Sequence, residues 1–294
     1  MTEKSGYIAI IGRPNVGKST LLNGLIGKKI SITSRKPQTT RNQILGIKTL
    51  DGIQAVYIDT PGLHIAEKNA MNRYMNRLAE SVIADADVVV FMIDALRWQK
   101  EDELVLNKLK SDAAPVILVI NKVDLVKDKN LLLPFIEKSQ EKFNFAKIVP
   151  LSARKASNVR HLEKVIMQFL PEGPHLFPDD QITDKSERFQ AAEIIREKII
   201  LTTGQEIPYS STVVIEEFKH EEKLLRISAL IWVEREGQKP IVIGKNGERL
   251  KTIGTAARKE LEKIFDKKVF LQLWVKIKDN WTNNENFLSS LGLE

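Results

Sequence analysis

Eight residues near the start of the chain have the types and the spacing of a phosphate-binding loop. They follow the pattern G-x-x-x-x-G-K-S and are Gly12, Arg13, Pro14, Asn15, Val16, Gly17, Lys18 and Ser19. The two glycines allow a tight turn whose backbone N–H groups point at phosphate oxygens. The lysine ammonium can reach the β- and γ-phosphates, and the serine hydroxyl can bind Mg²⁺. The pattern therefore predicts a site for a nucleotide.

The sequence on either side of this loop supports the prediction. An apolar run at residues 7–11 has the character of a buried strand, and residues 20–26 have that of a helix. A helix that begins at the loop directs the positive end of its dipole at the phosphates, so Thr20 is included in the predicted nucleotide-binding set. A glycine turn that matched the pattern by chance would lack this context.

Polar residues follow two later apolar runs and predict the rest of the nucleotide site. Asp59 can hold a water molecule on Mg²⁺, and the N–H of Gly62 can contact a γ-phosphate. The alternative is that this Asp-Thr-Pro-Gly sequence forms only an ordinary turn. This first group is Asp59, Thr60, Pro61, Gly62 and Leu63, and the second is Asn121, Lys122, Val123 and Asp124. A carboxylate at the end of the second group can accept hydrogen bonds from guanine N1–H and its 2-amino group, which adenine does not present. By analogy with other sites built to hydrogen-bond a substrate group, a buried carboxylate left unpaired there would reject the wrong base by about 10⁴-fold.

The remaining members of this group are expected to support the base. Asn121 can bridge the base and the phosphate loop, and the stem of Lys122 can cover the face of the ring. Ser152 and Ala153 follow the last predicted strand, where a backbone N–H can bond to guanine O6. All of these residues fall at the carboxyl ends of strands or in the loops beside them, where open α/β sheets bind ligands.

The order of elements in the first half predicts an α/β domain. Strands are expected at residues 7–11, 43–49, 53–58, 87–94, 115–120 and 147–151, and helices at 20–26, 71–84, 101–110, 131–143 and 159–170. Continuously apolar strands separated by helices indicate a mostly parallel sheet with helices on both faces. The turn at residues 50–53 predicts a hairpin, whose outer strand would be an antiparallel edge.

A change of pattern near residue 172 predicts a second domain. Three prolines fall within eight residues there, so we predict a domain at residues 1–171, a linker at 172–185 and a second domain at 186–294. The second domain reads as helix 186–201, strands 211–218 and 224–233, helix 248–265 and strand 268–277. This α+β order differs from that of the first domain.

Composition limits the class of protein. The 294 residues include no cysteine, which excludes disulfides and thiolate metal sites. No run approaches the roughly 18 apolar residues of a membrane span, and the start of the chain does not read as a secretory signal. Residues 1–171 carry a formal charge of +9 and residues 172–294 one of −2, yet residues 239–268 hold nine basic and four acidic side chains. A local positive surface is therefore expected in the second domain.

That basic stretch surrounds a second glycine turn. A G-x-x-G turn between two helical segments is what KH domains use to clamp single-stranded RNA. The predicted RNA-binding residues are Gly244, Lys245, Asn246, Gly247, Arg249, Lys251, Arg258 and Lys259. The alternatives are a plain elbow between two helices and an ordinary solvated helix face. Trp232, Phe270 and Trp274 lie in β runs, and we predict them to be core residues rather than base-stacking platforms.

Taken together, the motifs from residue 12 to residue 153 resemble the translation-factor class of P-loop GTPases. The resemblance implies GTP and Mg²⁺ as ligands, with GDP and phosphate as products. It also implies a loop threonine that binds Mg²⁺ only when the γ-phosphate is present, and the matching position is Thr40, with Thr39 as the alternative. Lys18, Thr40 and Gly62 are the expected catalytic residues, and Ser19, Thr40 and Asp59 the expected Mg²⁺ residues, the last through water.

One position departs from the pattern of Ras-like GTPases. The glutamine that orients the attacking water in those enzymes is replaced by Leu63, which cannot form that hydrogen bond. Relatives with such a replacement often carry a loop asparagine that helps to bind K⁺, and Asn15 occupies this position. His64 follows Leu63 and could act as a catalytic base. We favour the commoner case, in which a loop histidine is simply exposed to solvent.

Over nearly its whole length the chain resembles the Era family of bacterial ribosome-assembly GTPases. The resemblance implies a KH domain that binds 16S rRNA near its 3′ end, with a part in rRNA processing and 30S subunit maturation. It further implies a cytoplasmic protein with loose peripheral attachment to the inner membrane. We separately expect the protein to be a monomer. A rival interpretation is a GTPase whose second domain binds protein or membrane. A tRNA-modifying GTPase with a catalytic cysteine is disfavoured by the absence of cysteine.

Overall fold

The computed structural model describes residues 2–34, 36, 39–62, 70–109, 114–204 and 207–291. The chain packs as two compact units. Unit 1 comprises Met1–Ser31, Thr40–Lys68 and Asn72–Asp184, and unit 2 comprises Ile32–Thr39, Asn69–Met71 and Lys185–Glu294. Two short segments from the first half of the chain therefore belong to the second unit.

Unit 1 is built on a six-stranded sheet with the order β2-β3-β1-β4-β5-β6. Its strands are β1 Lys4–Ile11, β2 Ile44–Leu50, β3 Ile53–Asp59, β4 Val88–Asp94, β5 Val116–Asn121 and β6 Lys147–Pro150. Strand β2 pairs antiparallel with β3 at one edge, whereas the other pairs are parallel. The predicted parallel sheet with one antiparallel edge is confirmed.

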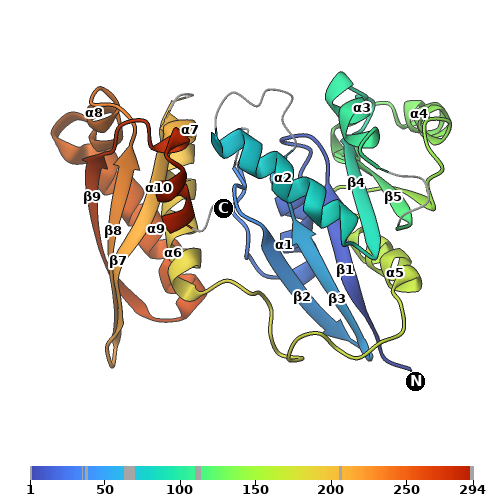
Figure 1. Ribbon diagram of the computed structural model, residues 1–294, viewed down its shortest axis with the longest axis horizontal. Coiled ribbons are helices and arrows are strands. Elements are labelled where there is room, and N and C mark those ends of the chain that lie inside the picture. Colours follow the sequence, from blue (N-terminus) through green and yellow to red (C-terminus); the bar gives the residue numbers. More distant parts are fainter. Residues whose placement is uncertain are drawn as a thin grey trace. The chain divides into compact units, whose positions relative to one another are not determined.

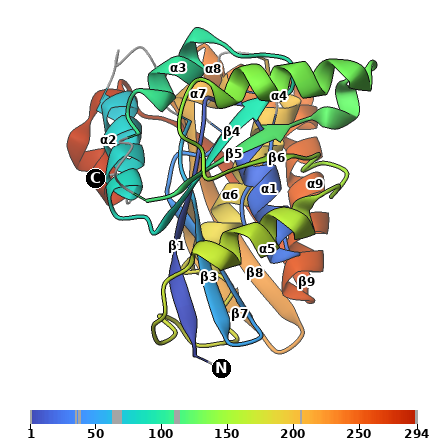
Figure 2. The ribbon, with the colours of Figure 1, turned by 90° about the vertical axis from the view of Figure 1, so that its right-hand side faces the viewer.

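Helices cover both faces of this sheet. They are α1 Lys18–Ile26, α2 Ala70–Ala84, α3 Lys100–Leu106, α4 Leu132–Gln140 and α5 Val159–Phe169. In Figures 1 and 2, α2 lies on one face and α1 and α5 lie on the other. Every residue of β4 and β5 is buried as a result, which explains why both sequences are apolar without alternation.

The segment predicted to be a linker is bonded along unit 1. Ile47 donates its N–H to the Ile182 carbonyl at 2.8 Å. The side chain of Gln54 accepts from the N–H groups of Leu176 and Phe177 and donates to the Phe177 carbonyl at 2.8 Å. Residues 172–184 are therefore part of unit 1, because their backbone groups find partners there, and unit 2 begins at Lys185.

Unit 2 contains a three-stranded sheet with the order β7-β8-β9. Its main elements are α6 Glu187–Thr202, β7 Ser211–His220, β8 Leu224–Val233, α8 Gln238–Ile243, α9 Glu248–Phe265 and β9 Lys268–Ile277. Strands β7 and β8 are antiparallel, and β8 and β9 are parallel. Two short helices, α7 Ile207–Ser210 and α10 Glu285–Ser290, were not predicted from the sequence.

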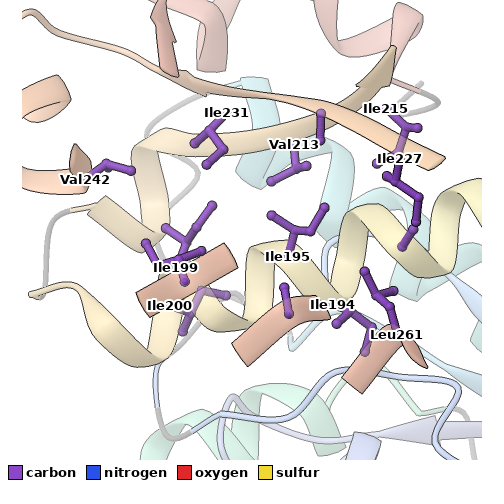
Figure 3. Close-up of a cluster of buried hydrophobic side chains, with 14 of the residues drawn as sticks. Ile194, Ile195, Ile199, Ile200, Val213, Ile215, Ile227, Ile231, Val242 and Leu261 are labelled. Atoms are coloured by element: carbon purple, nitrogen blue, oxygen red, sulfur yellow. The ribbon is translucent and has the colours of Figure 1, made fainter. Parts of the chain in front are cut away.

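The core of unit 2 lies between one face of this sheet and the helices. Figure 3 shows isoleucines of α6 meeting aliphatic side chains of β7, β8, α8 and α9. Ile194, Ile195 and Ile199 of α6 are at most 4% exposed. Ile32, from the short segment Ile32–Thr39, is 2% exposed and belongs to the same cluster. The segment is thus held in unit 2 by hydrophobic packing.

The C-terminal helix α10 packs on the other face of this sheet. Phe287 of α10 meets the ring of Trp232 on β8 edge to face, with the ring centroids 6.1 Å apart. Trp281 is fully buried beside it and donates its indole N–H to the Ser210 carbonyl at 2.9 Å. The sheet of unit 2 therefore has one face covered by long helices and a second that α10 covers at one end.

Candidate functional site

The glycines of the phosphate loop are fixed by close neighbours. Gly12 has a φ of 147° and Gly17 a φ of 106°, in the region that favours glycine. A Cβ at Gly12 would lie 2.5 Å from the Met92 carbonyl oxygen, and a Cβ at Gly17 would lie 2.4 Å from Nδ2 of Asn121. Neither position has space for a side chain, so the loop requires both glycines. Lys18, which follows Gly17 directly, opens α1 as predicted.

Lys18 lies inside the loop that it terminates. Its ammonium donates to the Gly12 carbonyl at 2.9 Å and to the Arg13 carbonyl at 3.1 Å, and the residue is 6% exposed. Burial lowers the pKa of Lys18 to about 8, and the nearby carboxylate of Asp59 opposes that shift. The cation is thus held where phosphate oxygens would compensate for its lost hydration.

Four oxygen-bearing side chains meet beside the first turn of α1. The Ser19 hydroxyl donates to Oδ2 of Asp59 at 2.7 Å and lies 2.9 Å from the Thr40 hydroxyl. The Ser31 and Thr40 hydroxyls also donate to Oδ2 of Asp59, at 2.9 and 3.3 Å. Oδ1 of Asp59 is buried without a hydrogen-bond partner among the described residues, and burial raises the pKa of this carboxyl.

This donor set fits Mg²⁺. Hard divalent cations prefer carboxylate and hydroxyl oxygens, and Oδ1 of Asp59 is a buried acceptor that needs a cation or a water molecule. Thr40 reaches the cluster, whereas Thr39 belongs to unit 2 and its hydroxyl bonds to the Lys36 carbonyl at 2.7 Å. Of the two candidate threonines, the geometry favours Thr40.

The chain that follows β3 packs directly against the phosphate loop. The Thr60 hydroxyl donates to the Ile10 carbonyl of β1 at 3.0 Å, which ties the two strand ends together. A Cβ on Gly62 would lie 2.9 Å from the backbone nitrogen of Pro14, so the chain after Pro61 approaches the loop as closely as glycine allows. Leu63 and His64 lie outside the described residues.

Asn121 joins the phosphate loop to the loop after β6. Its Nδ2 donates to the Val16 carbonyl at 2.7 Å, and its Oδ1 accepts from the Ala153 N–H at 3.0 Å. The predicted bridge to the phosphate loop is present. A backbone N–H of Ser152 or Ala153 was expected to reach guanine O6; that of Ala153 donates to this asparagine, and the contact with the base stays a prediction.

An ionic network, buried at Arg13, Asp94 and Asp102, is bonded to the same loop. Arg13 donates from Nε to Asp102 at 3.2 Å and from a terminal nitrogen to Asp94 at 2.8 Å. Lys122 pairs with Asp94 at 2.8 Å and donates to the Asn15 carbonyl at 2.7 Å. The side chain of Arg13 supports the loop through these two pairs, and the predicted contact of Arg13 with the nucleotide stays a prediction. The backbone carbonyl of Arg13 accepts from the Lys18 ammonium.

Asp124 lies in the short 3₁₀ helix η1, Val123–Leu125, which follows β5. It is partly exposed, not buried as our specificity argument assumed. A hydrogen bond from the Ser152 side chain holds the pKa of Asp124 below its usual range, so the carboxylate is charged and able to accept. Val123 donates its N–H to the Leu151 carbonyl at 3.3 Å, which fixes the start of this turn.

The glycine turn of unit 2 has one tight and one open position. Gly244 has a φ of 75°, and a Cβ there would lie 2.9 Å from the backbone nitrogen of Arg249. Gly247 has a φ of 79°, and a Cβ there would have no atom of the described residues within 4 Å, so this part of the turn is open. Asn246 between them is also left-handed, with a φ of 51°.

The basic residues around this turn differ in what they contact. Lys245, Lys251 and Lys259 are exposed. Arg249 donates back to the Ile241 carbonyl, and Arg258 pairs with Glu262 at 3.0 Å. The three lysines are therefore cations presented to solvent, whereas the two arginines are bonded within unit 2.

The prediction that three aromatic residues belong to the core is wrong for two of them. Phe270 is 40% exposed and Trp274 is 44% exposed. Both lie on β9, and their positions alternate with the buried Val269 and Val275. Trp232 is half-buried and packs against Phe287. Strand periodicity correctly placed them in a sheet, but the exposure of that face depends on tertiary structure.

Several residues of the site were missed by sequence reasoning. Asp94 and Asp102 anchor Arg13, and Ser31 bonds to Asp59. Asn23 holds Ser31 in place by accepting from its N–H at 3.0 Å and donating to its carbonyl at 2.7 Å. Asp94 ends a buried strand beside the phosphate loop, which was a usable signal; the others have none in the sequence.

The segment Ile32–Thr39 is bonded within unit 2. Thr33 donates its N–H to Glu197 of α6 at 2.9 Å. The Lys36 ammonium donates to the carbonyls of Ile200 and Thr203 at 2.5 Å each, where α6 ends, and Arg196 donates to the Thr39 carbonyl. A lysine is well suited to a helix C-terminus, because the last carbonyls lack partners within the helix.

Known proteins resemble both units. Residues 7–122 match the family described as 50S ribosome-binding GTPase, and residues 206–282 match the KH domain. GTPase Era of Haemophilus influenzae is 58% identical over 288 residues, which cover 98% of this chain and 95% of the relative. GTPase Era of Coxiella burnetii is 58% identical over 289 residues, which cover 98% of both chains.

Solved structures agree with these sequence relationships. A variant of Aquifex aeolicus Era bound to GDP and AlF4⁻ matches with a TM-score of 0.95 and 44% identity over 99% of both chains. An Era in complex with MgGDPNP and nucleotides 1506–1542 of 16S ribosomal RNA matches with the same score, identity and coverage. Within the described part of the chain, no helix has the length and apolarity to span a membrane. The chain therefore belongs to the Era family of GTPases, with a P-loop GTPase domain followed by a KH domain.

Proposed function

We propose that this GTPase binds 16S rRNA near its 3′ end through the KH domain and acts in rRNA processing and 30S subunit biogenesis. The observation that carries the proposal is the Gly244–Gly247 turn, which presents an open left-handed glycine and an exposed lysine at the start of α9. Backbone approach at a glycine and a nearby cation are what a KH turn needs to hold an RNA backbone. The Era relative whose complex contains nucleotides 1506–1542 of 16S rRNA supports the choice of RNA.

The test is a double substitution in this turn. Gly244→Asp with Gly247→Asp adds two negative charges where phosphates would bind, so affinity for a fluorescein-labelled RNA of nucleotides 1506–1542 should fall at least ~100-fold. GTP affinity should stay within about twofold of wild type, because the nucleotide residues lie in unit 1. Retained RNA affinity would contradict the role of this turn, and an absence of RNA binding by the wild-type protein would favour the rival, in which the second domain binds protein or membrane.

The nucleotide is proposed to bind with Mg²⁺ in unit 1. Ser19 and Thr40 would hold the ion directly and Asp59 through water, and the bound ion would neutralise charge on the β- and γ-phosphates. Lys18 would contact the same phosphates, and the Gly62 N–H would contact the γ-phosphate. Asp59→Ala should therefore weaken GTP binding in Mg²⁺ far more than in EDTA, as measured by titration of a fluorescent GTP analogue.

We further propose that GTP controls RNA binding. Ser31 and Thr40 bond to Asp59 in unit 1, while the segment between them packs in unit 2 against α6. A γ-phosphate that fixes Thr40 would restrain one end of a segment whose middle is bonded in the RNA-binding unit. This continuity of the chain gives the nucleotide a covalent route to the KH domain.

Potassium is proposed as an activator of hydrolysis. Asn15 is exposed and has a left-handed φ of 65°, and its carbonyl is held by Lys122. An amide oxygen is a suitable ligand for a hard cation. Hydrolysis should rise when Na⁺ is replaced by K⁺, and Asn15→Ala should remove that rise. Equal rates in the two salts would contradict this role.

The cytoplasmic location, the loose contact with the inner membrane and the monomeric state also remain proposals. Fractionation of cells and light scattering of the purified protein would test them.

A further inference from the structure

Strand β9 carries an alternating row of cationic, aromatic and polar side chains on one face. We name it the β9 row, and it consists of Lys268, Phe270, Gln272, Trp274 and Lys276, all of which are exposed. The intervening residues of β9 point into the core of unit 2 or pack against it. The row therefore lies on the face of the sheet opposite α6 and α9.

Neighbouring residues extend the positive charge of this face. Arg226 on β8 pairs with Phe270 in the register of the sheet, and its guanidinium lies 4.8 Å from the centre of that ring. Lys276 and Lys278 lie 6.0 and 5.9 Å from the ring of Trp232. Two carboxylates lie here as well, Glu217, which accepts from Ser228, and Glu221, which pairs with Arg226. On the described part of this face, cations outnumber carboxylates.

The two aromatic rings of the row are only partly packed, although the guanidinium of Arg226 lies over the ring of Phe270. Burying a tryptophan or a phenylalanine is favourable, yet Trp274 is 44% and Phe270 40% exposed, although α10 covers the sheet at Trp232. Two exposed rings on one strand, about 13 Å apart by strand geometry, each offer a flat surface to a ligand. Aromatic rings flanked by cations are the surface that sheets in RNA-binding domains present to nucleobases and phosphates.

The row also lies beside the glycine turn. Strand β9 is an edge of the three-stranded sheet, and Leu273 of this strand lies 3.4 Å from where a Cβ of Gly254 in α9 would be. Because α9 precedes β9 and packs against it, the turn at the start of α9 lies toward the end of β9 that carries Trp274 and Lys276. An RNA strand held by the turn can pass around this edge to reach the row.

We propose that the β9 row is a second RNA-binding surface, on which bases stack against Trp274 and Phe270 while Lys268 and Lys276 contact phosphates. The proposal rests on RNA binding by the KH domain and adds a separate contact on the opposite face of its sheet. The RNA that binds the β9 row should be single-stranded or contain unpaired nucleotides, since stacking on an aromatic ring requires a free base face.

The test compares variants of the full chain in binding the fluorescein-labelled RNA of nucleotides 1506–1542. Phe270→Ala with Trp274→Ala should weaken binding at least ~10-fold, because each stacked base contributes about tenfold in affinity. Phe270→Tyr with Trp274→Phe keeps both rings and should restore binding to within about threefold of wild type. Leu133→Ala, at an exposed leucine of α4, is the matched control and should bind as wild type.

The lysines give an independent readout. Lys268→Gln with Lys276→Gln should lower the slope of log affinity against log salt by about 1.4, since each phosphate contact of a single strand contributes about 0.7. Ultraviolet crosslinking of the same RNA should label the tryptic peptide of residues 269–276. Thermal melting of every variant should match wild type, because the substituted side chains are exposed.

The outcomes separate this proposal from the function on which it rests. If the alanine pair binds the RNA within about twofold of wild type and the peptide is not crosslinked, RNA does not use this face and the proposal is overturned. If Gly244→Asp with Gly247→Asp keeps wild-type RNA affinity while the alanine pair loses it, RNA binding by the KH turn is contradicted and RNA binding by the β9 row is supported.

Discussion

The two glycine turns of the molecule differ in what surrounds them. In the phosphate loop, a side chain on Gly12 or Gly17 would lie within 2.5 Å of Met92 or Asn121. In the KH turn, a side chain on Gly247 would have no described atom within 4 Å. Their cations differ in the same way, because Lys18 is buried and Lys245 is exposed.

The two proposed phosphate sites therefore have different surroundings. The phosphate loop is enclosed by the fold, so its groups are desolvated before the nucleotide arrives and their positions are fixed by neighbours. The KH turn is exposed, so its ligand contributes most of the surroundings. Substitutions at Gly12 or Gly17 should therefore change stability and binding together, whereas a substitution at the open Gly247 should chiefly change RNA binding.

The largest contrast is expected between Gly12→Ala and Gly247→Ala. The first places a Cβ against a backbone carbonyl that cannot move aside, so GTP binding should be lost and the melting temperature lowered. The second adds only the strain of a left-handed alanine, about 1 kcal/mol, and should leave GTP affinity unchanged. Titration of a fluorescent GTP analogue and thermal melting measure both. Wild-type GTP affinity in Gly12→Ala would show that the loop is not enclosed.

The next contrast concerns selectivity for the base. Asp124→Ala removes the carboxylate that Ser152 holds in its charged form, so the preference for GTP over ATP should fall by about 10³-fold or more. Competition between the two nucleotides measures the ratio. RNA affinity without nucleotide should be unchanged, because the KH turn shares no residue with this site; an unchanged GTP/ATP ratio would remove Asp124 from base recognition.

A smaller effect is expected at acidic residues beside the two turns. Asp102 is fully buried and pairs with Arg13, so Asp102→Asn should lower the free energy of unfolding by about 1–3 kcal/mol. Glu248 is exposed in the first turn of α9, and Glu248→Gln should change the free energy of unfolding by less than about 0.5 kcal/mol. Denaturant titration tests both. Equal effects would contradict the distinction between enclosed and open turns.

The smallest expected effect is a pH dependence of GTP binding, which arises from the buried Lys18. The free protein has Lys18 with a pKa of about 8, and bound phosphates favour its charged form, so the pKa rises on binding. Binding therefore takes up a proton above a pH of about 8, and GTP affinity should be level below that pH and fall toward about tenfold per pH unit above it. Calorimetry in two buffers measures the proton uptake. If GTP binding takes up no proton at about one pH unit above this pKa, Lys18 stays charged in the free protein, which would contradict the prediction.

The fold could be predicted because its signals are local. Strands β4 and β5 are continuously apolar, and the hairpin turn at Asp51 and Gly52 has the left-handed backbone that its residues favour. Boundaries of β8, α9 and β9 agree with those predicted. The short helices α7 and α10 were missed because four and six residues carry too little periodicity.

The nucleotide site was predictable for a similar reason, since its motifs have fixed spacing. What could not be predicted is which long-range partner each side chain finds. Arg13 turns to Asp94 and Asp102, and Ser31 joins Asp59, across separations that no local pattern encodes. The exposure of Trp274 was misjudged because the sequence shows strand alternation but not which face the helices cover.

GTP bound in unit 1 is proposed to control RNA binding in unit 2. Fluorescence anisotropy of the RNA of nucleotides 1506–1542, with the protein saturated first by GDP and then by a non-hydrolysable GTP analogue, tests it most directly. The RNA should bind more tightly with the analogue, by a factor typical of coupled sites, about 5- to 150-fold. Identical affinities in the two states would contradict it.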